Sequence, residues 1–293
     1  MFAIAGVSGN TGSVVADALL AQGKKVRVVV RTVAKGEAWK ANGAEVALAE
    51  LHDQAALTTA LAGTEGAYLL VPPDVTNAKV LESSVAIAKN LGVSVAAAKV
   101  PHVVLLSSLG AHLATGTGPI QWLHVAEAAL RASGAAVTAI RAGMFQENWG
   151  GSLSMLEKGL VPAFLPTDVH FPQVSTHDIA KVAAQALVAG GKGFNVIELL
   201  GPREYSWDDG ANELARITGK PVKAQQFPLE GVVPTFTGFG MSAEMATLYR
   251  EMFEGLIAGR VAQVAGATNT RVVRGHVGLD TTLRTLLAGA AKH

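Results

Sequence analysis

The chain has 293 residues and carries 24 lysines and arginines against 23 aspartates and glutamates, so its formal net charge is +1. This balance, without a basic block, excludes an extended electrostatic surface for nucleic acid. The absence of cysteine excludes disulfides, thiolate metal sites and a cysteine nucleophile, and it fits a reducing compartment.

The start of the chain and its apolar runs indicate in which compartment the protein is expected. Met1 leads directly into an apolar run and leaves no room for a signal peptide, so we expect a cytoplasmic protein. The longest apolar run, residues 93–106, is interrupted by Lys99, Pro101 and His102. A spanning helix needs roughly 18 apolar residues, so we expect no membrane partner.

The first predicted elements are a strand, a glycine turn and a helix. Residues 2–5 are apolar without alternation, as in a strand buried on both faces of a parallel sheet, and apolar residues then recur at helical spacing from Val14. Between them, Gly6, Gly9 and Gly12 follow the pattern Gly-x-x-Gly-x-x-Gly. Such a turn lets the backbone and the helix N-terminus approach a pyrophosphate. We interpret it as a nucleotide site; the alternative is a glycine turn with nothing bound.

The residues after the second predicted strand, residues 26–30, indicate which nucleotide binds. A site for NAD usually has Asp or Glu about 20 residues beyond the glycine turn, whereas NADP needs a cation for its 2′-phosphate. Here Arg31 occupies the position, Lys35 follows one turn later, and no carboxylate occurs before Glu37. We predict that Arg31, with Lys35 as a weaker second ligand, binds the 2′-phosphate and favours NADPH/NADP over NAD. The alternative is a solvated arginine at a strand end.

Strands and helices continue to alternate, which predicts a parallel sheet. The predicted strands are residues 44–48, 66–71, 103–108 and 136–141, and the predicted helices are residues 54–61, 77–91 and 120–132. Val71 and Pro72 end one strand, where the backbone would face the nicotinamide. Ser107 and Ser108 end the next, at the edge where ligands bind in open parallel sheets. They are candidate nicotinamide and substrate contacts, or hydroxyls that fix the turn before Gly110.

The chain becomes irregular from Pro162 onward. We predict strands at residues 194–200 and 221–227, helices at 153–158, 179–188, 207–219, 241–258 and 279–288, and a loop at 231–240. These later pieces are too few for a second sheet. We therefore predict an α/β fold: a doubly wound parallel sheet of Rossmann type, residues 1–147 plus about 173–200, with a smaller, mainly helical substrate lobe, residues 148–172 plus 201–293.

The common catalytic pair of short-chain dehydrogenases is absent. That pair is a tyrosine acid with a lysine one helical turn later, Tyr-x-x-x-Lys. The only tyrosines are at positions 68, 205 and 249, and Pro, Asp and Phe stand four residues after them. The helix that would carry the pair offers His124 and Glu127, which share a face. His124 is a candidate catalytic residue; the alternative is a surface histidine beside a surface glutamate.

Metal and hydrolase motifs are also absent from the sequence. No His-x-x-x-His pair with a nearby glutamate occurs, so we predict no metal site. There is no Gly-x-Ser-x-Gly elbow and no Gly-Lys-Ser or Gly-Lys-Thr of a P-loop.

An ordered set of motifs runs along nearly the whole chain. It comprises the turn at residues 6–12, Arg31, Val71-Pro72-Pro73, Leu130-Arg131-Ala132-Ser133-Gly134, Arg141 with Phe145 and Glu147-Asn148, Leu199-Leu200-Gly201-Pro202, and Tyr205-Ser206. This set resembles the NmrA-like, NAD(P)H-binding group of atypical short-chain dehydrogenases. The resemblance implies a Rossmann fold with a small C-terminal substrate lobe, usually NADP-preferring and without the Tyr-Lys pair. The group includes NADPH-dependent quinone reductases, triphenylmethane dye reductases and non-enzymatic redox sensors that regulate transcription factors.

The resemblance also implies roles for residues at matching positions. The turn, including Gly6, Ser8, Gly9, Asn10, Thr11 and Gly12, would hold the pyrophosphate. Val71 and Pro72 would lie on the nicotinamide side. Many relatives carry a lysine or histidine on the helix after the fifth strand, and His124 is the nearest equivalent, offset by one residue.

We therefore predict an NADPH-dependent oxidoreductase that reduces quinones or similar electron-poor conjugated small molecules by hydride transfer. Such acceptors yield a stabilised anion that water or a weak donor such as His124 can protonate. Candidates for the apolar pocket wall are Phe145, Trp149, Phe236 and Phe239, which are equally suited to the core. The alternative is a non-catalytic sensor of the NADP(H) ratio that acts through a protein partner. Whether the chain forms a homo-oligomer or binds a regulatory protein stays open.

Overall fold

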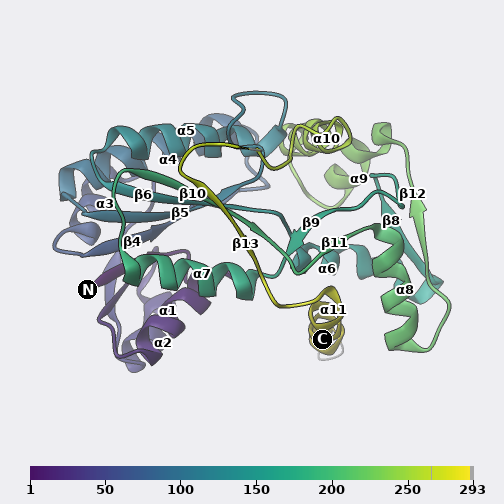
Figure 1. Ribbon diagram of the computed structural model, residues 1–293, viewed down its shortest axis with the longest axis horizontal. Coiled ribbons are helices and arrows are strands. Elements are labelled where there is room, and N and C mark those ends of the chain that lie inside the picture. The colour runs from purple at the N-terminus through teal and green to yellow at the C-terminus, as the bar shows by residue number, and fades with distance from the viewer. Residues whose placement is uncertain (265, 291–293) are drawn as a thin grey trace.

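The computed structural model describes residues 1–264 and 266–290 and has a parallel eight-stranded sheet at its centre (Figure 1). The strand order is β13-β10-β6-β5-β4-β1-β2-β3, and each neighbouring pair is parallel. The strands are β1 (Phe2–Ala5), β2 (Val26–Val30), β3 (Glu45–Leu48), β4 (Gly66–Leu69), β5 (His102–Ser108), β6 (Ala136–Ala142), β10 (Phe194–Leu200) and β13 (Thr270–Arg274). From β1 the chain adds β2 and β3 toward one edge of the sheet, and from β4 it adds β5 and β6 toward the other edge. The topological switch point therefore lies between β1 and β4. The predicted Rossmann-type sheet is confirmed.

Helices cover both faces of the sheet (Figure 1). One face carries α1 (Gly12–Ala21), α2 (Val33–Ala41) and α7 (Thr176–Ala189); the other carries α3 (Gln54–Leu61), α4 (Val80–Ala98) and α5 (Gln121–Ala132). Alternate strand residues enter two separate cores: Val104 packs on the first face, whereas Val103 and Leu105 pack on the second. Burial on both faces explains why the strands are continuous apolar runs.

The most apolar long helix is α4, whose 19 residues reach a mean hydropathy of 1.2 and so meet the length and composition of a membrane span. Sequence reasoning predicted no such segment. Within the fold, Ala88, Leu91 and Val95 of this helix are fully buried against the sheet and its neighbours. We therefore read α4 as a core helix of the α/β layers.

The C-terminal lobe contains short helices and two small sheets. Its helices are α6 (Trp149–Ser152), α8 (Trp207–Thr218), α9 (Val232–Gly238), α10 (Ala243–Ile257) and α11 (Leu279–Ala290). One sheet joins β11 (Glu204–Tyr205), β9 (Phe171–Val174) and β7 (Met144–Phe145), and the other joins β12 (Lys223–Gln226) and β8 (Leu160–Ala163). Single 3-10 segments span Gly118–Ile120, Gln146–Asn148, Leu153–Lys158 and Leu229–Gly231.

Several predictions about this lobe were wrong. We expected no second sheet, but the structure has two small ones. Their strands have two to four residues, which is too short for a recognisable alternation of apolar and polar residues in the sequence. The loop expected at residues 231–240 is mostly helix α9, because Pro234 lies in its first turn, where a missing N–H costs little. Residues 153–158 form a 3-10 segment where a helix of the α type was expected.

Strand β13 was not foreseen at all. It lies within the segment assigned to the lobe, yet it pairs with β10 at the edge of the main sheet. About 70 residues separate the two strands, so no local pattern reveals their pairing. The remaining domain boundaries stay a prediction.

Candidate functional site

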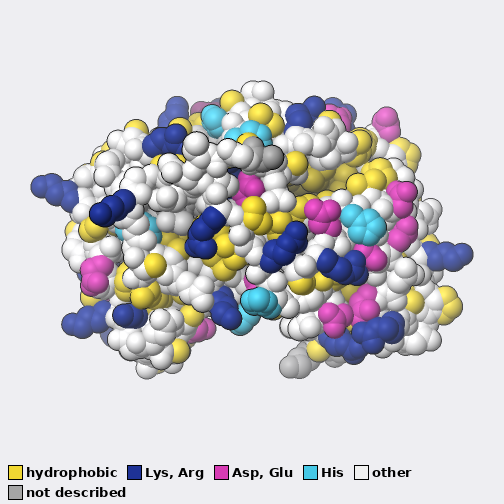
Figure 2. All heavy atoms as spheres, in the orientation of Figure 1, with side chains coloured by type: hydrophobic (Ala, Val, Ile, Leu, Met, Phe, Trp, Pro, Cys, Tyr) yellow, Lys and Arg dark blue, Asp and Glu magenta, His cyan; other side chains and the backbone are white. Residues whose placement is uncertain are grey.

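A cavity of about 1710 Å³ is lined both by the carboxyl-terminal ends of the parallel strands and by the C-terminal lobe. Small-molecule pockets usually measure roughly 300–1,000 Å³, so this one has room for a dinucleotide and a second molecule. On the face drawn in Figure 2, hydrophobic side chains gather in a hollow below α10. The predicted residues that line the cavity are Gly6, Ser8, Gly9, Asn10, Thr11, Arg31, Lys35, Val71, Pro72, Ser107, Ser108, Phe145, Phe236 and Phe239.

The three glycines of the turn are not equivalent. Gly6 has a φ of +73°, and a Cβ there would lie 2.4 Å from Leu70 Cδ2. A Cβ on Gly12 would lie 2.5 Å from the carbonyl oxygens of Ala5 and Gly6, so this glycine allows α1 to pack closely on β1. A Cβ on Gly9 would meet only the Gly6 oxygen, at 3.5 Å. The fold thus requires Gly6 and Gly12, whereas Gly9 borders open space in the cavity.

The N-terminus of α1 points its backbone at this space. The N-cap residue Thr11 makes no side-chain bond to the helix, so the first N–H groups are not capped by it. Its hydroxyl instead accepts a hydrogen bond of 2.9 Å from Tyr68 Oη. Burial raises the pKa of Tyr68, which keeps this donor neutral. An uncapped helix N-terminus with a fixed turn favours an anion such as a phosphate.

Two cations border the cavity beside the glycine turn. Arg31 directly follows β2, Lys35 lies in the first turn of α2, and both are exposed. Within residues 1–264 and 266–290, neither side chain forms a hydrogen bond or an ion pair. A guanidinium without a protein partner can bind a phosphate through two parallel hydrogen bonds.

A buried polar group lies under the predicted nicotinamide end. Ser107 Oγ donates a 2.6 Å hydrogen bond to Glu127 Oε1, and Arg141 binds the same carboxylate through Nε at 2.9 Å and Nη2 at 2.7 Å. Although burial opposes the charge, the hydrogen bonds that Arg141 donates to the Glu127 carboxylate raise the pKa of Arg141. Because Ser107 already donates its hydroxyl proton to Glu127, its oxygen can only accept a further hydrogen bond. The carboxylate that was paired with His124 on sequence grounds is therefore bound to Arg141 and Ser107.

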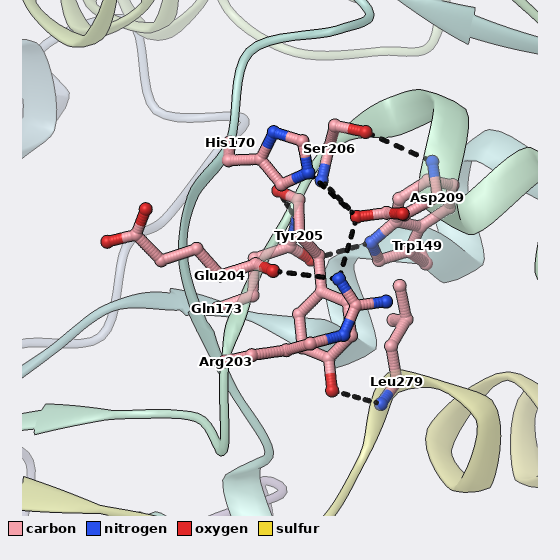
Figure 3. Close-up of polar contacts among 9 residues, drawn as sticks. All are labelled: Trp149, His170, Gln173, Arg203, Glu204, Tyr205, Ser206, Asp209 and Leu279. Carbon is pink, nitrogen blue, oxygen red and sulfur yellow. Dashed lines mark hydrogen bonds and ion pairs between the residues drawn. The ribbon is translucent and has the colours of Figure 1, made fainter.

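His124 and Trp149 do not line the cavity. His124 Nδ1 lies 3.0 Å from the Ala111 carbonyl oxygen, on a different part of the surface of α5 from the cavity-lining Trp122. Trp149 is fully buried, and its ring centroid lies 4.3 Å from that of Trp207. Its indole N–H donates to Gln173 Oε1 at 2.9 Å (Figure 3). Gly12 does not line the cavity either, and acts through packing.

The polar cluster around Trp149 in Figure 3 is structural. Asp209 closes the capping box of α8 with Ser206 and forms an ion pair of 3.0 Å with Arg203. Nε2 of His170 lies 3.2 Å from the same carboxylate. Burial alone would raise the pKa of Asp209, but the bonds from Ser206 and Arg203 hold it below its usual range. These contacts fix the start of α8 against β11 and so hold the lobe together.

An aromatic wall on the lobe side of the cavity was largely missed from the sequence. Phe164, Phe227, Tyr249 and Phe253 join the predicted Phe236, with ring centroids 5.2 to 6.3 Å apart. We considered Tyr249 only as a member of the absent Tyr-Lys pair. The amphipathic pattern of residues 241–258 contained the signal, since residues 249 and 253 are four apart and share a helix face.

Comparison with known proteins places the chain among reductases that use nicotinamide cofactors. The model of the NmrA-like family matches residues 1–276. An NAD(P)H azoreductase of Xenophilus azovorans is 26% identical over 258 residues, which cover 86% of each chain. Quinone oxidoreductase 2 of Escherichia coli (strain K12) is 27% identical over 263 residues, covering 88% of this chain and 89% of that protein.

Solved structures agree with this placement. A crystal structure of an NADPH-dependent quinone oxidoreductase of Escherichia coli complexed with NADPH matches with a TM-score of 0.79 and 27% identity, over 90% of this chain and 91% of that chain. A triphenylmethane reductase of Citrobacter sp. complexed with NADP(H) matches with a TM-score of 0.82 at 18% identity, over 98% and 100% of the chains. At 18% identity, the match to the triphenylmethane reductase shows a shared fold alone.

Proposed function

The chain belongs to the NmrA-like family, and from this premise we propose that it is an NADPH-dependent oxidoreductase that reduces quinones or similar electron-poor conjugated molecules. The observation that carries the proposal is the continuity of one cavity. It extends from Arg31 past Gly9 and Ser107 to the aromatic wall at Phe236. A phosphate-binding turn and an apolar acceptor site would thus share one cavity.

The residues present fit the cofactor. The open space at Gly9 and the uncapped start of α1 suit a pyrophosphate, with Gly6, Ser8, Asn10 and Thr11 completing the turn. Arg31 and Lys35 would bind the 2′-phosphate. Val71, Pro72 and Ser107 would contact the nicotinamide, whose carboxamide N–H can donate to the Ser107 oxygen.

When bound, reduced nicotinamide would supply a hydride, which is two electrons and one proton, so that a quinone would become a hydroquinone anion that takes its second proton from water. The chain supplies orientation and an apolar wall, because Ser108, Phe145, Phe236 and Phe239 line the part of the cavity that would hold the acceptor. No strong acid is needed for such an acceptor. His124 lies outside the cavity, so we assign the second proton to water.

The relatives do not favour the regulatory alternative. The curated relatives are an azoreductase and a quinone oxidoreductase, which act on small molecules. A homo-oligomer, a regulatory protein partner and the cytoplasmic location stay predictions.

Steady-state assays test the proposal. Purified protein mixed with NADPH and a panel of quinones should oxidise NADPH, seen as a loss of nicotinamide absorbance above the uncatalysed rate. Tight NADPH binding without any oxidation across the panel would contradict the enzyme and favour the sensor.

A further inference from the structure

Tyr249 lies where the nucleotide-binding domain meets the lobe. Its side chain packs against the core shared by the sheet and α3 to α5. Its ring also contacts Phe236 edge-on, with centroids 5.2 Å apart, and Phe253, with centroids 6.3 Å apart. The residue lines the cavity, so it belongs at once to the aromatic wall and to the rigid domain below it.

The helix that carries Tyr249 is fixed to the nucleotide-binding domain. Ser242 N donates to Val75 O at 2.8 Å, and Leu81 N donates to Glu244 Oε2 at 3.1 Å. These bonds attach the start of α10 to the segment that follows Val71 and Pro72. The position of Tyr249 is therefore set relative to the predicted nicotinamide end, as a substrate-contacting residue requires.

The hydroxyl of Tyr249 differs from the other two tyrosine hydroxyls in its hydrogen bonding. Tyr68 Oη donates to Thr11, and Tyr205 Oη accepts from Leu279 N, but Tyr249 Oη has no hydrogen-bond partner within residues 1–264 and 266–290. Burial raises the pKa of Tyr249, so the phenol stays protonated and can only donate or weakly accept. Tyr249 is half-buried in the cavity wall, so its hydroxyl can donate to a molecule in the cavity without breaking a hydrogen bond within the protein.

We infer that Tyr249 Oη donates a hydrogen bond to the electron-accepting heteroatom of a flat conjugated substrate, a quinone carbonyl oxygen or an azo nitrogen, that lies against Phe236 and Phe253. This inference rests on the proposed function. The acceptor gains a hydride, which is two electrons and one proton, as the nicotinamide is oxidised, and negative charge develops on its heteroatom. Tyr249 stabilises that charge and keeps its own proton; water supplies the proton that completes the reduction.

Tyr249→Phe tests this role because it removes one oxygen and keeps the ring. We expect kcat/KM for the quinone menadione to fall roughly 10- to 100-fold, the range for loss of a hydrogen bond to a developing charge. The dissociation constant for NADPH and the melting temperature should stay unchanged. Phe253→Leu is the matched control: it removes apolar wall area without touching a hydroxyl, so it should raise KM more than it lowers kcat.

A binding measurement separates the hydrogen bond from packing without turnover. The dissociation constants of menadione and of 2-methylnaphthalene, which has the same rings but no carbonyl, are measured on protein loaded with NADP by quenching of tryptophan fluorescence. Tyr249→Phe should weaken menadione binding and leave 2-methylnaphthalene binding unchanged.

The outcomes distinguish this inference from the proposed function. NADPH oxidation by wild-type protein with an unchanged Tyr249→Phe variant overturns the inference alone. Equal weakening of both ring compounds also overturns it, because the effect would then be one of packing. If wild-type protein oxidises no NADPH with any quinone, the proposed function fails and the inference fails with it.

Discussion

A methyl group added at Gly9 should weaken cofactor binding without harming the fold. The Cβ of Gly9→Ala would meet only the Gly6 oxygen, at 3.5 Å, which is ordinary contact, and Gly9 is not among the glycines with positive φ. A compatible Gly to Ala change stabilises proteins by about 0.4–1 kcal/mol, so we expect an unchanged or slightly raised melting temperature. The same Cβ enters the space predicted for the pyrophosphate. Loss of even one charged hydrogen bond costs about 1.5–3 kcal/mol, which weakens NADPH roughly 10- to 100-fold.

Gly12→Ala is the matched control in the same turn. Its Cβ would lie 2.5 Å from the carbonyl oxygens of Ala5 and Gly6, so α1 would have to move away from β1. Overpacking of this kind costs about 1–3 kcal/mol. For a chain of this size each kcal/mol lowers the melting temperature by roughly 2–4 °C.

Two measurements on each variant decide the matter: the melting temperature without cofactor, and the NADPH dissociation constant by calorimetry. The reasoning predicts that Gly9→Ala loses affinity alone and that Gly12→Ala loses stability. Wild-type NADPH affinity in a folded Gly9→Ala protein would show that the space at Gly9 is not the pyrophosphate site.

Three further predictions concern charge and burial. Arg31→Ala should weaken NADPH at least roughly tenfold and NADH less than about twofold, since only NADPH carries the 2′-phosphate; equal losses by calorimetry would show that Arg31 does not contact that phosphate. Arg141→Leu leaves the Glu127 carboxylate buried without its cation, so the free energy of unfolding in urea should fall by about 3–5 kcal/mol, and a loss below about 1 kcal/mol would contradict the pairing. His102 is buried, and its Nδ1 has no hydrogen-bond partner among residues 1–264 and 266–290. Burial lowers the pKa of His102 below its usual 6.5, so the unfolded chain takes up a proton at a higher pH than the folded chain. The free energy of unfolding should therefore decline as the pH falls through about 6.5, and less steeply in His102→Gln.

The sequence predicted those parts of the site that depend on local pattern. The glycine turn after β1 and the cation after β2 follow from strand-turn-helix order, because each is defined by residues a few positions apart. Arg31 and Lys35 do line the same cavity as Gly9, as that order implied. Their contact with a 2′-phosphate stays a prediction.

The missed features depend on tertiary packing. His124 and Glu127 are both on α5, and the sequence does not show that the buried Arg141 on β6 binds the carboxylate while His124 turns away. Trp149 was a candidate for the pocket wall that suited the core equally well, and the sequence does not show that Trp207 and Gln173 hold it in the core. Tyr249 became a candidate only once the three-dimensional structure placed it in the cavity wall, with no hydrogen-bond partner for its hydroxyl among residues 1–264 and 266–290.

The central claim is that one cavity holds both NADPH and the electron acceptor. Rapid mixing of NADPH-loaded protein with increasing menadione tests it most directly, by following the nicotinamide absorbance in a single turnover. The account predicts a decay whose rate saturates with menadione, because the acceptor must occupy the cavity before it is reduced. A decay no faster than that of free NADPH with menadione would contradict it.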